Sequence, residues 1–125
     1  MIKVKKTTIT SAELLALDVT SKTILAAPVS GKVNNVIGIS AKLDYNSIAY
    51  AGGFLQGYCN DVSPVVMFTN ANILSKTADR TEPFTQASLS IASLDIDFKL
   101  KASAAITTGN SPIDIYVIYE EKDLI

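Results

Sequence analysis

Two alternating runs in the last third of the chain constrain the fold most strongly. In 95–101 every second side chain is apolar, and in 113–120 one set of alternate positions is apolar throughout. A period of two is typical of a β-strand that buries one face. The segment between the runs contains Gly109-Asn110-Ser111-Pro112, which is dense in turn residues. We therefore predict that the two runs pair as an antiparallel β-hairpin.

Shorter runs of the same kind extend along the rest of the chain. The closely spaced apolar segments, broken by turn residues, indicate an all-β antiparallel fold of about eight strands, either a sandwich, a jelly roll or a barrel. A length of 125 residues fits a single domain spanning 1–125. The polar segment 75–83 is predicted to be a surface loop. Further strands are predicted over 3–9, 22–27, 33–45, 47–60, 65–69 and 84–94.

Two local patterns refine this prediction. Thr10 and Glu13 have the spacing of a capping box, which predicts one short N-terminal helix of about two turns. Gly38 lies inside the long predicted strand 33–45, where it indicates a β-bulge or a close backbone approach. Gly52 and Gly53 interrupt the next strand and suggest a turn or a loop tip. The predicted core face of the long strand holds Ile37, Ile39, Ala41, Leu43 and Tyr45.

Composition limits the kinds of partner. Hydrophobic residues make up 48% of the chain and charged residues 18%, so part of the apolar surplus should lie in a large core or a subunit interface. The net charge of -1 gives no basic excess for binding nucleic acid. No apolar stretch approaches the roughly 20 residues of a membrane span, and the N-terminus lacks the apolar run of a signal peptide. We expect no nucleic-acid or membrane partner and assembly in a cytoplasm.

The residues that most enzymes depend on are scarce. There is no histidine, and Cys59 is the one cysteine, which excludes a disulfide within the chain and leaves no usual ligand set for zinc. Asp95, Asp97 and Asp114 have two interpretations. They form a calcium site or a glycosidase carboxylate pair, or they belong to a solvated charged face. Lys99 and Lys101 beside them favour the solvated face. We expect no enzymatic activity, cofactor or metal.

Candidate binding residues remain. Tyr50 and Tyr58 could stack on sugar rings, although tyrosines in strands more often pack in a core or an interface. The 75–83 loop adds Lys76, Asp79 and Arg80 as possible ligand-facing residues. Lys3, Lys5 and Lys6 form a basic cluster that is either a solvated strand face or a docking site for a neighbouring protein.

Several short motifs, most of them within 8–52, form a recurring pattern. The chain here resembles a group of small phage and prophage virion proteins, although Val29-Ser30 stands before Gly31 where many of them have Pro-Gly. The resemblance implies a jelly-roll-like β-sandwich, a capsid-decoration or head-fibre role and a homotrimer on the virion. The alternative is a carbohydrate-binding or receptor-binding module on a particle surface. The matching segments are 11–14, 26–28, 31–33, 43–45, 49–50 and 108–110.

Overall fold

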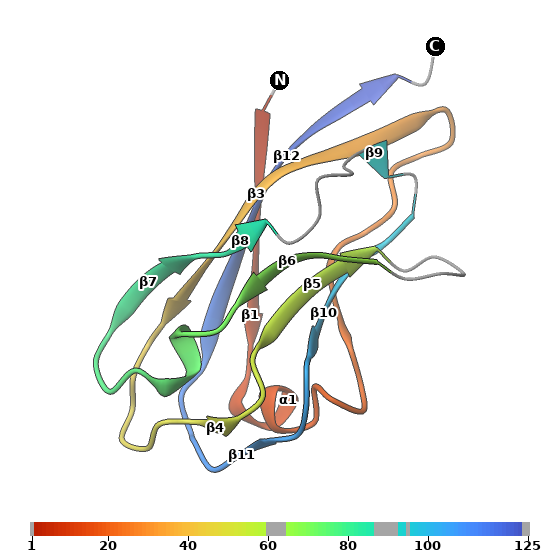
Figure 1. Ribbon diagram of the computed structural model, residues 1–125. Helices are drawn as coiled ribbons and strands as arrows, with labels where there is room; N and C mark the ends of the chain where they lie inside the picture. The colour runs from red at the N-terminus through yellow and green to blue at the C-terminus, as the bar shows by residue number, and fades with distance from the viewer. Residues whose placement is uncertain (1, 60–64, 87–92, 95, 124–125) are drawn as a thin grey trace.

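Two antiparallel β-sheets form the body of the protein in the computed structural model, which describes residues 2–59, 65–86, 93–94 and 96–123 (Figure 1). Sheet A has the order β1-β12-β3-β7, with β9 also paired to β3, and sheet B has the order β2-β10-β5-β6-β8. The strands of sheet A are β1 (Ile2–Ile9), β12 (Ile113–Asp123), β3 (Lys32–Leu43), β7 (Arg80–Pro83) and β9 (Ser93–Leu94). Those of sheet B are β2 (Lys22–Leu25), β10 (Phe98–Ala102), β5 (Leu55–Cys59), β6 (Val65–Asn70) and β8 (Thr85–Gln86).

The inner faces of the two sheets share one hydrophobic core. Alternate residues of β10 and of the first half of β12 are buried, as their period of two predicts. The prediction of an all-β antiparallel sandwich with one short helix is confirmed. Twelve strands lie in the described residues instead of about eight, because four of them, including β4 (Ala51–Gly52) and β11 (Ile106–Thr107), are only two residues long. The core residues with no exposed surface on β10 and β12 are Phe98, Leu100, Ile113, Ile115 and Val117.

The predicted hairpin between 95–101 and 113–120 is wrong. Strand β10 pairs with β2 and β5 in sheet B, whereas β12 pairs with β1 and β3 in sheet A. The alternating pattern identified the buried face of each strand correctly, but the two buried faces belong to opposite sheets. The aspartates separate accordingly, since Asp97 accepts a hydrogen bond from the Ala27 N–H and Asp114 accepts one from Thr8. Asp95 lies outside the described residues.

A β-bulge divides the long strand β3. Gly38 pairs with Ile118 and Val36 with Tyr119, so Ile37 has no partner on β12 and the alternation changes at this point. As predicted, Ile39, Ala41 and Leu43 face the core. Ile37 is 49% exposed, and Val36 takes the inward place at 4%. Gly38 therefore marked the bulge, while the predicted burial of Ile37 is wrong.

The helix α1 (Ser11–Leu15) begins with the predicted capping box. The Thr10 hydroxyl accepts from the Glu13 N–H at 3.2 Å, and the Glu13 carboxylate accepts from the Thr10 N–H at 3.0 Å. The helix has five residues, shorter than the two turns expected, and two leucines anchor it to the core. In Figure 1 it lies at the same end of the sandwich as β4 and β11. The anchoring leucines are Leu14 and Leu17, both at most 1% exposed.

The structure corrects the predicted loop at 75–83 and the predicted turn at Gly52-Gly53. The segment 75–83 is only partly a loop, because β7 pairs with β3 after the short 3-10 helix η1 (Ile73–Ser75). Gly52 and Gly53 are not a loop tip. A Cβ on either glycine would overlap the backbone of residues 104–105, so this pair permits a close crossing of two chain segments. Most of the predicted strand 84–94 falls on 87–92, outside the described residues.

Candidate functional site

A densely hydrogen-bonded surface lies at one end of the sandwich, which we name the loop end (residues 44–50, 72–80 and 103–112). Asn110 is central to it: its side-chain oxygen accepts from the N–H groups of Ser47 and Ile48, at 3.2 and 3.0 Å. The Asn110 amide also donates to the Ser47 hydroxyl at 2.7 Å. These bonds hold the segment after β3 against the segment before β12. These side-chain bonds add to the backbone bond from the Asn110 N–H to the Ile48 carbonyl in fixing the loop end.

Tyr50 lies beneath this surface and not on it. Its ring is 3% exposed, and its hydroxyl donates to the Ser111 carbonyl at 2.5 Å. The Ser111 side chain, also buried, accepts from the Asn46 N–H at 2.8 Å. Burial raises the pKa of the Tyr50 hydroxyl above its ordinary value of 10.0. The prediction that Tyr50 faces a ligand is wrong, because both the ring and its hydroxyl are used inside the fold.

Tyr50→Phe should lower the free energy of unfolding by about 1–2 kcal/mol at neutral pH, since it leaves the Ser111 carbonyl without its buried donor. The raised pKa adds a pH dependence. Above pH 10 the unfolded chain loses the Tyr50 proton while the folded chain keeps it, so wild-type stability should fall as pH rises there. The Tyr50→Phe variant should not show the loss of stability above pH 10 that comes from this hydroxyl. Urea denaturation from pH 7 to 11 measures both effects.

Tyr45→Phe is the matched control, because its hydroxyl bond to the Ser47 carbonyl is at the surface. Tyr45→Phe should lower the free energy of unfolding by less than about 0.5 kcal/mol. Equal losses for the two tyrosines would contradict the assigned role of Tyr50.

The residues predicted from the 75–83 segment do lie at the loop end. The Asp79 carboxylate accepts from the Tyr45 N–H at 2.9 Å, and the Arg80 guanidinium pairs with Glu82 at 2.5 Å. Lys76 closes η1 through its backbone N–H. Asp79 and Arg80 are exposed and Lys76 is half-buried. Asp79 therefore holds the loop in place, and nothing in these contacts gathers the three residues around one ligand.

Tyr58 lies on the outer face of sheet B, on β5, away from Tyr50. It is 8% exposed, and the Lys101 ammonium covers its ring, 4.8 Å from the centroid. A ring covered by a cation on the protein's own chain offers no open face for a sugar. The prediction of a ligand-facing Tyr58 is therefore wrong. The structure does not bring the two predicted tyrosines together.

The N-terminal lysines lie on β1, whose one strand partner in the described part of the chain is β12. Lys3 pairs with Glu121 and Lys6 with Asp114, each at 3.7 Å. No ion pair involves Lys5 among the residues that the structure describes. Strand alternation places Lys5 and Lys6 on opposite faces of sheet A, so the cluster is not one basic patch.

An exposed apolar stripe crosses the outer face of sheet A. Val4 on β1 is 61% exposed and lies opposite Ile118 on β12, which in turn lies opposite Gly38 beside the bulged Ile37. The apolar outer face of the last strand is visible in the sequence. The exposure of Ile37 is not, because it depends on the bulge. We name this surface the sheet A stripe: Ile2, Val4, Ile37, Tyr116 and Ile118.

Within 2–59, 65–86, 93–94 and 96–123, no group of three acidic, cysteine or histidine side chains could hold a metal ion. No helix in the same residues is long and apolar enough to span a membrane. Cys59 is a free, half-buried thiol packed against the core.

Comparison with known proteins shows a likeness of fold. No protein-family model matches the chain. No curated protein matches its sequence. Among solved structures, a chain of the cyanophage Pam1 capsid asymmetric unit is similar at a TM-score of 0.58 and 15% sequence identity. The match covers 94% of this chain and 83% of that one, so the two share their fold over nearly the whole of this protein.

Proposed function

We propose that this protein is a non-enzymatic structural component of a phage virion, a capsid-decoration or head-fibre protein that assembles as a homotrimer. The observation that carries the proposal is the fold likeness to a chain of a phage capsid, which extends over 94% of this protein. Assembly would take place in the host cytoplasm. The motifs within 8–52 and 108–110, which resemble small phage virion proteins, support the same role.

The sheet A stripe supports self-association. Ile2, Val4 and Ile37 are about half or more exposed, and they lie together on one sheet face. Contiguous apolar surface on a small domain marks an interaction site. The occupant we propose is a second copy of the chain, since a ring of copies also covers the free edge of β1.

The solution mass tests this proposal directly. Light scattering of the purified protein should give roughly three times 13.3 kDa, and this mass should persist on dilution. A monodisperse species of 13.3 kDa would contradict homotrimeric assembly.

Val4→Glu should shift the trimer to monomer, because it puts a charge into the apolar contact while leaving the core intact. Val29→Glu is the matched control: Val29 is 68% exposed but lies in the turn before Gly31, away from the stripe. The control should keep the wild-type mass. If both variants stay trimeric with native circular dichroism, the stripe is not the interface.

A further inference from the structure

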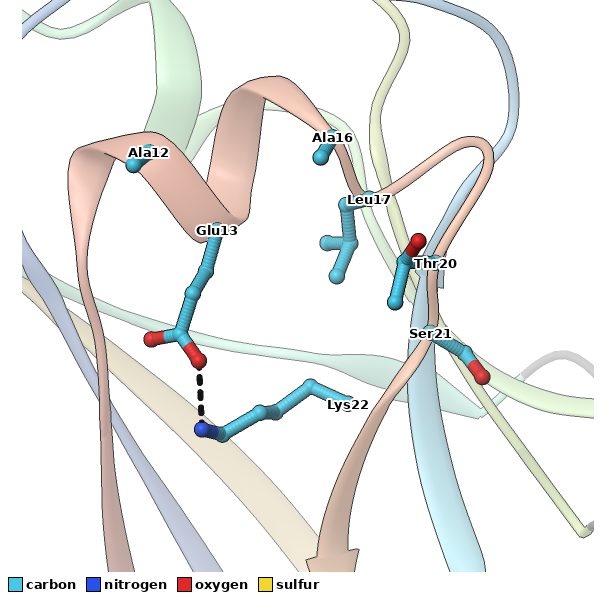
Figure 2. A pocket seen from close by; sticks show the side chains of 7 residues that line it. All are labelled: Ala12, Glu13, Ala16, Leu17, Thr20, Ser21 and Lys22. Atoms are coloured by element: carbon cyan, nitrogen blue, oxygen red, sulfur yellow. Dashed lines mark hydrogen bonds and ion pairs between the residues drawn. The ribbon is translucent and has the colours of Figure 1, made fainter.

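A cavity of about 270 Å³ lies where the chain passes from α1 into β2 (Figure 2). Leu17 is the most deeply buried lining residue, at 1% exposed, whereas Ala12 and Ala16, which also line the cavity, are exposed. Figure 2 shows the Leu17 side chain directed toward the space between Glu13 and Lys22. A cavity of about 150 Å³ holds a benzene-sized group, so this one has room for a branched aliphatic side chain and part of its backbone. Thr20 and Ser21 complete the lining.

The rim of the cavity carries a donor beside an acceptor. The Lys22 ammonium donates to one oxygen of Glu13 at 2.5 Å, and the other oxygen accepts from the Thr10 N–H. Lys22 keeps two N–H groups for another acceptor, and each carboxylate oxygen keeps a second lone pair. The hydrogen bond from Lys22 lowers the pKa of Glu13, so this carboxylate stays ionised at neutral pH.

This rim suits a group that is polar but carries no net charge. The two opposite charges cancel at a distance, so a free anion or cation gains little from them. A peptide unit offers a C=O to Lys22 and an N–H to Glu13, one on each side of a side chain that can enter the cavity. The polar rim and the apolar floor therefore match one residue of a polypeptide.

We propose, on the basis of the proposed virion role, that this cavity receives one leucine, isoleucine or valine side chain of a neighbouring protein in the particle. The aliphatic group packs on Ala16 and Leu17. The flanking peptide groups bind the Glu13–Lys22 pair. This contact is separate from the sheet A stripe and gives the protein a second surface for assembly.

The test is an NMR titration of the full ¹⁵N-labelled chain with N-acetyl-leucine-N′-methylamide. We expect saturable shifts confined to residues around 12–22, with a dissociation constant on the order of millimolar, as suits so small a ligand. The capped alanine analogue should bind roughly tenfold or more weakly, because it buries three fewer carbons. Equal effects of the two probes, or shifts that do not saturate, would overturn the proposal.

Three variants sharpen the assignment. Ala16→Leu fills the cavity and should abolish the shifts, and Lys22→Met keeps the stem but should weaken binding about fivefold or more. Lys99→Met is the matched control, since Lys99 is also a half-buried strand lysine but neighbours Tyr58 on the outer face of sheet B. Retained leucine binding in Ala16→Leu would refute the cavity as the site. A trimer that binds no capped leucine would refute this proposal alone, whereas a monomer that binds it would refute the trimer.

Discussion

Gly109→Ala is expected to destabilise the fold by roughly 2–5 kcal/mol. Gly109 has φ +87°, a conformation that costs other residues about 1–2 kcal/mol, and an added Cβ would also overlap the Tyr50 ring. The ring cannot move away freely, because its hydroxyl is bound to the Ser111 carbonyl. Urea denaturation should show a lower midpoint with an unchanged slope, since the surface exposed on unfolding is the same.

Gly31→Ala separates the two causes. Gly31 has almost the same backbone conformation, φ +85°, but no atom lies within 4 Å of the position a Cβ would take. Gly31→Ala should lose only the stability that a positive φ costs an alanine, about 1–2 kcal/mol. If the two variants lose the same stability, the contact with Tyr50 does not contribute. If Gly109→Ala in a Tyr50→Leu background is as costly as in the wild type, the same conclusion follows.

The period of two in the sequence predicted which face of each strand is buried, but not which strands pair with one another. Phe98 and Leu100 were placed on a buried face, as were Ile113, Ile115 and Val117, and the structure agrees. Alternation reports which side of a strand is buried, whereas pairing depends on the path of the connecting chain. Here residues 103–112 carry the chain from sheet B to sheet A, so the two strands face each other across the core instead of sharing hydrogen bonds.

The prediction that Tyr50 and Tyr58 face a ligand was wrong for a different reason. A tyrosine combines an apolar ring with a polar tip, so its sequence context does not decide between core and surface. Tyr50 is buried because Gly109 and Ser111, about 60 positions away, pack on its ring and accept its hydroxyl. Tyr58 is covered because Lys101 lies over it. These contacts join residues far apart in the sequence, so no local sequence pattern predicts them.

Signals that depend on neighbouring residues alone succeeded. The Thr10–Glu13 spacing predicted the helix start, and Gly38 predicted the bulge. Neither signal showed the consequence for function. The bulge exposes Ile37 on the sheet A stripe, and Glu13 also pairs with Lys22 at the rim of the cavity.

Phe98→Ala should remove about 3–5 kcal/mol, much of the 5–15 kcal/mol that usually stabilises a domain. The Phe98 ring has no exposed surface, and it makes an edge-to-face contact with Phe68 at a centroid distance of 6.2 Å. Removing the ring leaves a void between the sheets that the surrounding strands cannot close. Val29→Ala, at a 68% exposed position outside the sheet A stripe, should stay within about 1 kcal/mol of the wild type. Thermal and urea unfolding measure both changes.

A double-mutant cycle with Gly57, on the neighbouring strand β5, tests the same packing. A Cβ on Gly57 would lie 3.1 Å from the Phe98 ring and from the Ile39 side chain, so Gly57→Ala alone should cost about 1–3 kcal/mol. In a Phe98→Leu background the smaller side chain leaves space for this Cβ. The double variant should therefore be more stable than the added single losses predict, by at least about 0.5 kcal/mol. Strict additivity would mean that Gly57 is required by Ile39 or by the strand itself, and not by the Phe98 ring that joins the two sheets.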